Sequence, residues 1–339
     1  MSPKLNKAII AVTTTAAAIS SLSPIPVHSA DPIASLSSGG PVWTMEPDAS
    51  GQFFAIAGAE RILHMSDIGH GMYGFPAFYG AHVVAFAPMP VVIAAQGDFI
   101  IAYDFTSTLP IWSKPLLAGD DLKYYSDYIH GSQYLMAGYV DDYELRDVVT
   151  DELLATWDYD SNSALSQLPD FIANPAEGVA LVGNIVLESN GVQDLAVLRY
   201  DGSTTSVVTR RISSGCTRQV ALTPDVQFAA FVFSPISGPN QHSATLHVLS
   251  MIDLQDYLTI PEVPIARDLR YSPDGSKLAV LSSGTAIDVY ETIGYTVTET
   301  IPLPEGEYGT ALAWLADGAT LVIGTQGGNL WMLKPAASS

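Results

Sequence analysis

Two arginines at equivalent positions of neighbouring repeats are the side chains best suited to hold a ligand. Arg218 and Arg267 each stand six residues before a proline that recurs along the chain. A guanidinium stays charged and can grip a carboxylate or phosphate through two parallel hydrogen bonds. Three further polar residues lie at or near the same position of other repeats: His82, Lys123 and Glu307. We therefore predict a site for a protein partner or a small anionic ligand at these five residues.

The same arginines have a structural alternative. An acidic residue lies near this position in two repeats, at Asp170 and Asp268. If the arginines bond these carboxylates across neighbouring repeats, they hold the fold together and bind no ligand. The sequence leaves both interpretations open.

One short segment has the oxygen pattern of a metal site. Asp158, Asp160 and Asn162 alternate as the first ligands of a calcium loop do. Ser163 replaces the glycine of such a loop, and Pro169 stands where a glutamate would close it. A turn rich in Asp and Asn is the alternative interpretation. We therefore expect no cofactor, with calcium at these three residues as the one exception carried forward.

No catalytic set is evident in the sequence. The chain lacks a phosphate-cradling glycine loop, a nucleophile elbow, a metalloprotease helix motif and a paired-cysteine metal signature. Its single cysteine, Cys216, has no nearby histidine in the sequence that could act as a base. These absences favour a non-catalytic protein.

A repeated phrase predicts the elements that position these residues. It consists of two alternating apolar residues and a proline, often followed by aspartate and a turn, and its clearest copy is 269–275. Self-similarity at a period of about 40 to 50 residues indicates a repeat architecture. Aligned on the proline or its equivalent, the phrase occurs at Pro47, Pro88, Asp127, Pro175, Pro224, Pro273 and Ala316.

The best repeat predicts four short strands, at 269–271, 277–281, 286–290 and 295–301. The last repeat stops after its third strand, at 333–335, and residues 32–36 are placed to supply the missing one. The predicted fold is therefore all-β, a seven-bladed β-propeller of four-stranded antiparallel blades. Its ring is closed by the N-terminal strand in the last blade.

Residues 32–335 resemble the WD40 and YVTN-type seven-bladed β-propellers. Residues 271–279 look like the phrase that opens a blade in those families, and 287–291 look like its third strand. The Gly-His pair and the Trp-Asp ending of true WD40 repeats are absent. The resemblance implies the architecture and no particular activity.

The first thirty residues read as a secretory signal peptide. Lys4 and Lys7 form a basic start, residues 8–19 carry no charge, and small residues precede a cleavage point after Ser29. This apolar stretch falls short of the roughly 20 residues that a membrane-spanning helix needs. We expect residues 1–30 to be removed and 31–339 to form one propeller domain, periplasmic or extracellular and not inserted in a membrane.

The charge of the chain narrows its partners. A net charge of −21 disfavours nucleic acid and anionic membranes. We predict an exported, non-catalytic binding or scaffold protein that recognises its partner or ligand at one end of the ring. The alternative is an enzyme or enzyme subunit, similar to a lactonase or to the β-chain of a quinoprotein amine dehydrogenase. In that alternative, Arg218, Arg267 and His82 would polarise an anionic substrate.

Overall fold

The structure is a computed structural model that describes residues 244–335 without interruption. Before them it describes the strands together with residues 42, 150, 152, 223–225 and 227. The predicted signal peptide, residues 1–30, lies outside the described residues. Among those described there is no helix, and hence none that is long and apolar enough to cross a membrane.

The described strands form seven antiparallel sheets of four strands each. The first four sheets follow the chain order: β2 (Thr44–Pro47), β3 (Phe53–Ala57), β4 (Arg61–His64) and β5 (Tyr73–Gly74); β6 (Ala81–Phe86), β7 (Val91–Gln96), β8 (Phe99–Asp104) and β9 (Leu109–Pro115); β10 (Tyr124–His130), β11 (Gln133–Ala137), β12 (Asp142–Asp147) and β13 (Leu153–Asp158); β14 (Ala173–Asn174), β15 (Val179–Val182), β16 (Gln193–Tyr200) and β17 (Thr205–Ile212).

The last three sheets contain most of the side chains that the structure describes. Their strands are β18 (Cys216–Leu222), β19 (Phe228–Ser234), β20 (Ala244–Ser250) and β21 (Asp256–Val263); β22 (Ala266–Tyr271), β23 (Lys277–Ser282), β24 (Ala286–Glu291) and β25 (Thr296–Pro302); β26 (Gly309–Trp314), β27 (Leu321–Thr325), β28 (Asn329–Leu333) and β1 (Ala34–Ser37).

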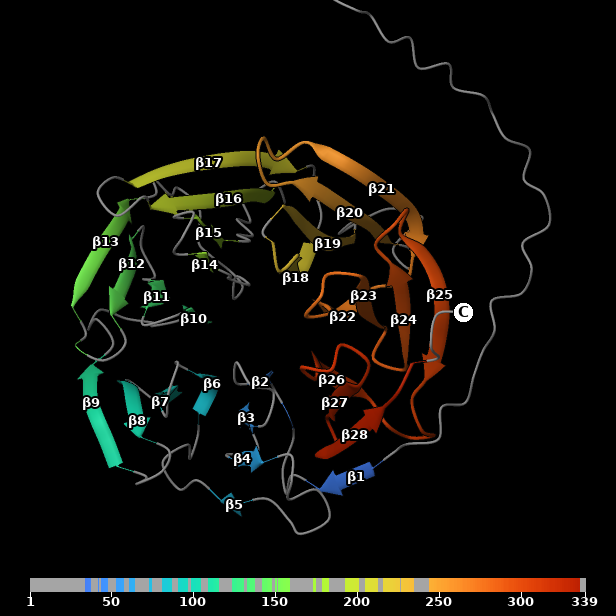
Figure 1. Ribbon diagram of the computed structural model, residues 1–339, viewed down its shortest axis with the longest axis horizontal. Helices are drawn as coiled ribbons and strands as arrows, with labels where there is room; N and C mark the ends of the chain where they lie inside the picture. The colour runs from blue at the N-terminus through green and yellow to red at the C-terminus, as the bar shows by residue number, and fades with distance from the viewer. Residues whose placement is uncertain are drawn as a thin grey trace, which may run out of the picture.

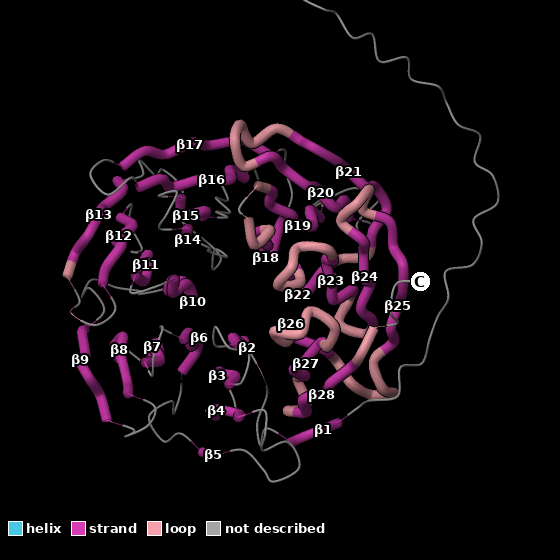
Figure 2. The backbone as a smooth tube through the Cα atoms, viewed as in Figure 1, coloured by secondary structure: helices cyan, strands magenta, loops and turns pink. Residues whose placement is uncertain are grey.

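The sheets stand as blades around a common centre (Figure 1). The first strand of each blade, from β2 through to β26, is the innermost one, and Figure 2 shows strands joined by loops and turns. The inner strand β2 contacts the inner strands of both neighbouring blades, β6 on one side and β26 on the other. The prediction of an all-β propeller is confirmed.

The N-terminal strand lies in the last blade, as the sequence predicts. β1 pairs antiparallel with β28, from Ala34 opposite Met332 to Ser37 opposite Asn329. It begins two residues later than the predicted strand at 32–36. Next to this blade, the Val42 amide donates a 3.1 Å hydrogen bond to the Thr325 carbonyl, so both ends of the described chain meet here.

The core consists of layers between neighbouring blades. Leu278 and Val280 of β23 pack into the layer toward β19 and β20. Ala279 and Leu281 of the same strand pack into the layer toward β27. Successive side chains of a strand point to opposite faces of its sheet. Because each blade packs between two other blades, its strands are apolar on both faces. This explains why the blade strands read as nearly continuous apolar runs.

The recurring Pro-Asp phrase folds as one type of turn after the inner strand. In the blade of β22, the Ser272 amide donates to the Lys277 carbonyl at 2.8 Å. The Asp274 Oδ1 atom accepts bonds from the Ser272 hydroxyl at 2.6 Å and the Ser276 amide at 3.0 Å. Asp225 and Asp317 accept equivalent backbone bonds in the two neighbouring blades. The repeat in the sequence is thus a repeated turn, closed by a carboxylate.

Candidate functional site

The predicted ligand position falls on a β-bulge near the start of the inner strands. In β22 the pairing passes from Ala266 opposite Ser282 to Asp268 opposite Leu281, which leaves Arg267 as an extra residue. The pairings of β6, β18 and β26 shift at the equivalent place, at His82, at Arg218 with Gln219, and at Thr310. Bulges re-aim a side chain out of the regular sheet and recur next to binding sites. The bulge is therefore the structural feature that His82, Arg218 and Arg267 share at this position of the repeat.

Arg267 lies over an aromatic ring that comes from the next blade. Its Cζ atom is 5.1 Å from the centre of the Tyr308 ring, within cation–π range. The ring in turn packs against Gly284, where an added Cβ would lie 2.7 Å from the Tyr308 Cζ atom. Gly284 also has a φ of +75°, which disfavours other residues. A glycine turn thus makes room for the ring that holds the guanidinium.

Glu307 is the second predicted site residue that the structure describes in detail. Its Oε1 atom accepts a hydrogen bond from the Asn329 side-chain amide at the start of β28. Its backbone amide donates a 3.0 Å bond to the Pro304 carbonyl. The carboxylate therefore fastens the loop before β26 to the last blade, beside the Tyr308 ring that follows it in the chain.

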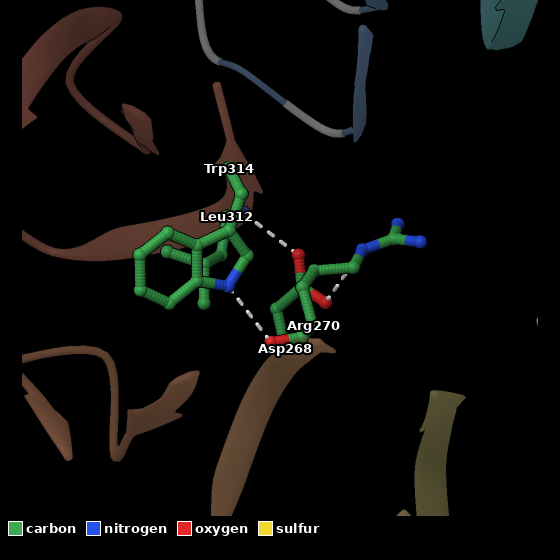
Figure 3. A network of polar contacts seen from close by, with 4 residues as sticks. All are labelled: Asp268, Arg270, Leu312 and Trp314. Atoms are coloured by element: carbon green, nitrogen blue, oxygen red, sulfur yellow. Dashed lines mark hydrogen bonds and ion pairs between the residues drawn. The ribbon is translucent and has the colours of Figure 1, made fainter. Parts of the chain in front are cut away.

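A buried carboxyl group next to Arg267 in the chain joins two blades (Figure 3). Asp268 is 2 % exposed, and its Oδ2 atom accepts a 2.7 Å hydrogen bond from the Leu312 amide of β26. The Arg270 Nε atom lies 3.5 Å from the Asp268 Oδ1 atom. The indole of Trp314 donates a 3.0 Å bond to the Arg270 carbonyl. Strands β22 and β26 are thus linked by side chains at two points.

The structural alternative for the two arginines stays open, because Asp170 and the side chain of Arg218 lie outside the described residues. Among the described contacts, Asp268 forms an ion pair with Arg270 and accepts a hydrogen bond from a backbone amide of the next blade. Arg267 contacts the ring of Tyr308. Its guanidinium edge, which carries the N–H donors, is therefore not used by the ring contact.

The comparisons with known proteins agree with this geometry. No family model and no curated protein matches the chain. Among solved structures, the WD40 domain of Pan2 from Neurospora crassa is similar with a TM-score of 0.66 and 13 % identity, covering 93 % of this chain and 99 % of that one. The β-propeller domain of Cps50 (Swd1) from Myceliophteria thermophila has the same TM-score and identity, covering 91 % of this chain and 100 % of that one.

In fold, the chain is a β-propeller similar to these two WD40 and Swd1 domains. In this propeller the inner strands surround the central axis, so a residue at the start of an inner strand lies at one end of the ring (Figure 1). Arg267 and Tyr308 therefore lie at that end, near the hub. The identities are too low to carry an activity from either structure to this one.

The structure places the remaining predicted residues as follows. His82 and Arg218 lie on inner strands β6 and β18, each at the bulge. Asp158 ends β13, where it pairs with Asp142. Lys123, Asp160 and Asn162 lie outside the described residues, so the calcium prediction stays a prediction. In the part of the chain that is described, no three His, Cys, Asp or Glu residues are placed to hold a metal ion.

Sequence reasoning did not single out Tyr308 or Asn329. The binding residues expected from the repeats were mainly charged, and neither Tyr308 nor Asn329 is charged. A glycine at the turn between second and third strands, as at Gly284, is the signal that could have pointed to an aromatic neighbour. That signal becomes specific only when the next blade is in place.

Proposed function

We propose that this protein is an exported, non-catalytic β-propeller that binds a protein partner through the Arg267 end of its ring. The observation that carries the proposal is the guanidinium of Arg267, held over the Tyr308 ring at a bulge of the inner strand. WD40-type propellers commonly act as protein-interaction scaffolds, and this association supports the same conclusion.

The chemistry of the site favours an acidic group on the partner. A ring contacts the flat face of a guanidinium, while the five N–H donors point outward from its edge. Arg218 occupies the equivalent bulge of the adjacent blade. Two guanidinium groups at one end of the ring would form charge-assisted bonds with a carboxylate of the partner, and the same groups would accept a small anionic ligand.

Export is part of this proposal. It is supported by the basic start, the uncharged stretch and the small residues of 1–30. The expected location is the periplasm or the extracellular space. The proposal requires no cofactor, and calcium at Asp158, Asp160 and Asn162 stays a prediction from the sequence.

An affinity experiment with charge-matched variants tests the function. Wild-type protein, the Arg218→Ala/Arg267→Ala variant and the Lys277→Ala/Lys334→Ala variant are immobilised and exposed to the exported protein fraction of the source cells. Both variants lose two positive charges. Lys277 begins β23 and Lys334 directly follows β28, so both lie at the end of the ring away from Arg267. A protein retained by the wild type and the lysine variant, and lost by the arginine variant, is the expected partner.

The partner is then purified and its affinity measured by calorimetry. Removal of both arginines should weaken binding by about tenfold or more, because charge-assisted hydrogen bonds are lost. Equal retention on all three columns would contradict the proposed site. Turnover of a lactone or an amine by the wild-type protein alone would support the enzyme alternative instead.

A further inference from the structure

A cavity lies between two blades at the opposite end of the ring from Arg267. Its volume is about 270 Å³, and it opens between the turns that follow β18 and β22. Arg267 is near the start of β22, whereas Asp274 follows the end of that strand. The cavity is therefore separated from the proposed partner site by the length of the inner strand. Its volume is just below the range of roughly 300 to 1,000 Å³ of drug-sized ligand sites, so it suits a single side chain.

The walls of this cavity are aromatic. Phe228 and Tyr257 come from one blade, with ring centres 4.7 Å apart and planes inclined by 50°. Tyr295 comes from the other blade, and its hydroxyl lies 2.8 Å from the buried hydroxyl of Tyr271. Ring faces attract cations, because the π-system carries negative charge above its plane.

Two carboxylates also line the cavity. Asp225 and Asp274 each belong to the repeated turn of one of the two blades. Bonds from the Ser272 hydroxyl and the Ser276 amide hold the pKa of Asp274 below its ordinary value, so this carboxylate is charged at neutral pH. Burial raises the pKa of Tyr295, and the negative charge of Asp225 raises it further. The tyrosine hydroxyl therefore stays neutral, and the described lining contains two acidic side chains and no basic one.

Exposed apolar side chains flank the opening. Ile293 is 91 % exposed and directly follows Thr292, which lines the cavity. Tyr257 is 62 % exposed, although its ring also forms part of the wall. Large apolar side chains on a surface are typical of contacts with another protein, where a partner covers them around a central anchor. A free small cation would leave both residues uncovered.

We propose that this cavity binds an arginine side chain of a basic protein partner. The guanidinium would stack on the Phe228 and Tyr257 rings and donate hydrogen bonds to Asp225 and Asp274. The planar guanidinium of arginine can stack on the ring faces while its forked N–H donors bond the carboxylates. The compact ammonium of lysine does not stack in this way. The net charge of −21 attracts a basic partner and disfavours a second copy of this chain as the occupant.

A peptide titration followed by NMR tests this site on the purified protein. The probe is the acetylated, amidated peptide Leu-Gly-Arg-Gly-Leu, compared with versions that carry lysine or citrulline in place of arginine. The arginine peptide should bind saturably and shift resonances of the residues around the cavity. Citrulline, which keeps the shape and removes the charge, should abolish binding, and lysine should bind several-fold more weakly.

Matched variants separate the cavity from general charge. Asp274→Asn and Asp317→Asn each remove one negative charge from the same turn position of neighbouring blades, but Asp317 does not line the cavity. An Asn oxygen can still accept the turn bonds. We expect Asp274→Asn to weaken the arginine peptide about tenfold and Asp317→Asn less than twofold. Tyr257→Ala should also weaken it several-fold at little cost in stability, because the side chain is largely exposed.

Three outcomes would overturn the proposal. They are the absence of saturable binding of the arginine peptide at millimolar concentration, equal binding of the lysine or citrulline peptide, and equal losses in Asp274→Asn and Asp317→Asn. Removal of Arg218 and Arg267 should leave this titration unchanged, so its result is independent of the proposed partner site.

Discussion

The side chain of Asp268 accepts a 2.7 Å hydrogen bond from the Leu312 amide at its Oδ2 atom, which joins two blades through a buried polar group. The inner strands β22 and β26 share this contact and the bond from the Trp314 indole to the Arg270 carbonyl. Since Arg267 precedes Asp268 directly in the chain, this contact also fixes the backbone from which the candidate ligand-binding guanidinium projects.

Replacement of Asp268 by alanine should destabilise the propeller by about 2 to 4 kcal/mol. The change leaves the buried Leu312 amide without its acceptor and Arg270 without its ion pair. Urea unfolding followed by tryptophan fluorescence measures the effect. Asp253→Ala, which alters an exposed turn, is the control and should cost well under half as much. Equal effects of the two changes would show that Asp268 does not join the blades.

The contact between Arg267 and Tyr308 should have a measurable coupling energy. A double-mutant cycle with Arg267→Ala and Tyr308→Ala should yield about 0.5 to 1 kcal/mol, the range of a partly exposed cation–π pair. Thermal unfolding of the wild type, the two single variants and the double variant gives the stabilities from which the coupling energy is calculated. Tyr308→Phe keeps the ring and should retain most of the coupling. Additive effects within error would mean that the ring does not hold the guanidinium.

The packing of Val42 on Gly324 makes a prediction about the last blade. A Cβ added at Gly324 would lie 2.4 Å from the Val42 Cγ1 atom, so Gly324→Ala should destabilise by about 1 to 3 kcal/mol. Val42→Ala in the same chain should recover part of this loss by vacating the space. Gly327→Ala is the control, because its added Cβ would be 3.6 Å from the nearest atom. No rescue by Val42→Ala would contradict the observed contact.

The repeated turns should make stability depend on acid pH. The pKa of Asp274 is lowered, chiefly by the Ser272 hydroxyl, and that of Asp317 is lowered by the bonds from Ala319 and Thr320 despite burial. A lowered folded-state pKa contributes stability above the ordinary value of about 3.9, which is lost as pH falls through the folded value. Thermal midpoints between pH 6 and pH 2.5 should therefore fall less steeply in Asp274→Asn/Asp317→Asn. An unchanged slope would show that these turns do not contribute.

Variants of the hydrogen-bonded hydroxyl groups of Tyr271 and Tyr295 should show how much an unpaired buried hydroxyl lowers the free energy of unfolding. Tyr295→Phe should destabilise by about 1 to 3 kcal/mol, because it leaves the Tyr271 hydroxyl without its partner at 2.8 Å. The Tyr271→Phe/Tyr295→Phe protein should be less destabilised than this single variant, since both polar groups are gone. Urea unfolding compares them. A larger loss in the double variant would exclude this explanation.

Much of the fold could be predicted from the sequence because it depends on neighbouring residues. The predicted strand 277–281 corresponds to β23, and the predicted strand 286–290 to β24. Alternation of apolar residues and the Pro-Asp turn act within a few residues, so each repeat carries its own signal. The placement of Arg267 at one end of an inner strand followed from the same register.

The sequence by itself determined the repeats, their strands and turns, the strand that joins the last blade, and the register of the arginines. Only the tertiary structure decided what those arginines and turns contact. The ring under Arg267, the amide bound by Asp268 and the Phe228 and Tyr257 rings in the cavity with Asp274 all come from adjacent blades. Such contacts depend on the bulges and on how neighbouring sheets pack, and no local pattern encodes that geometry.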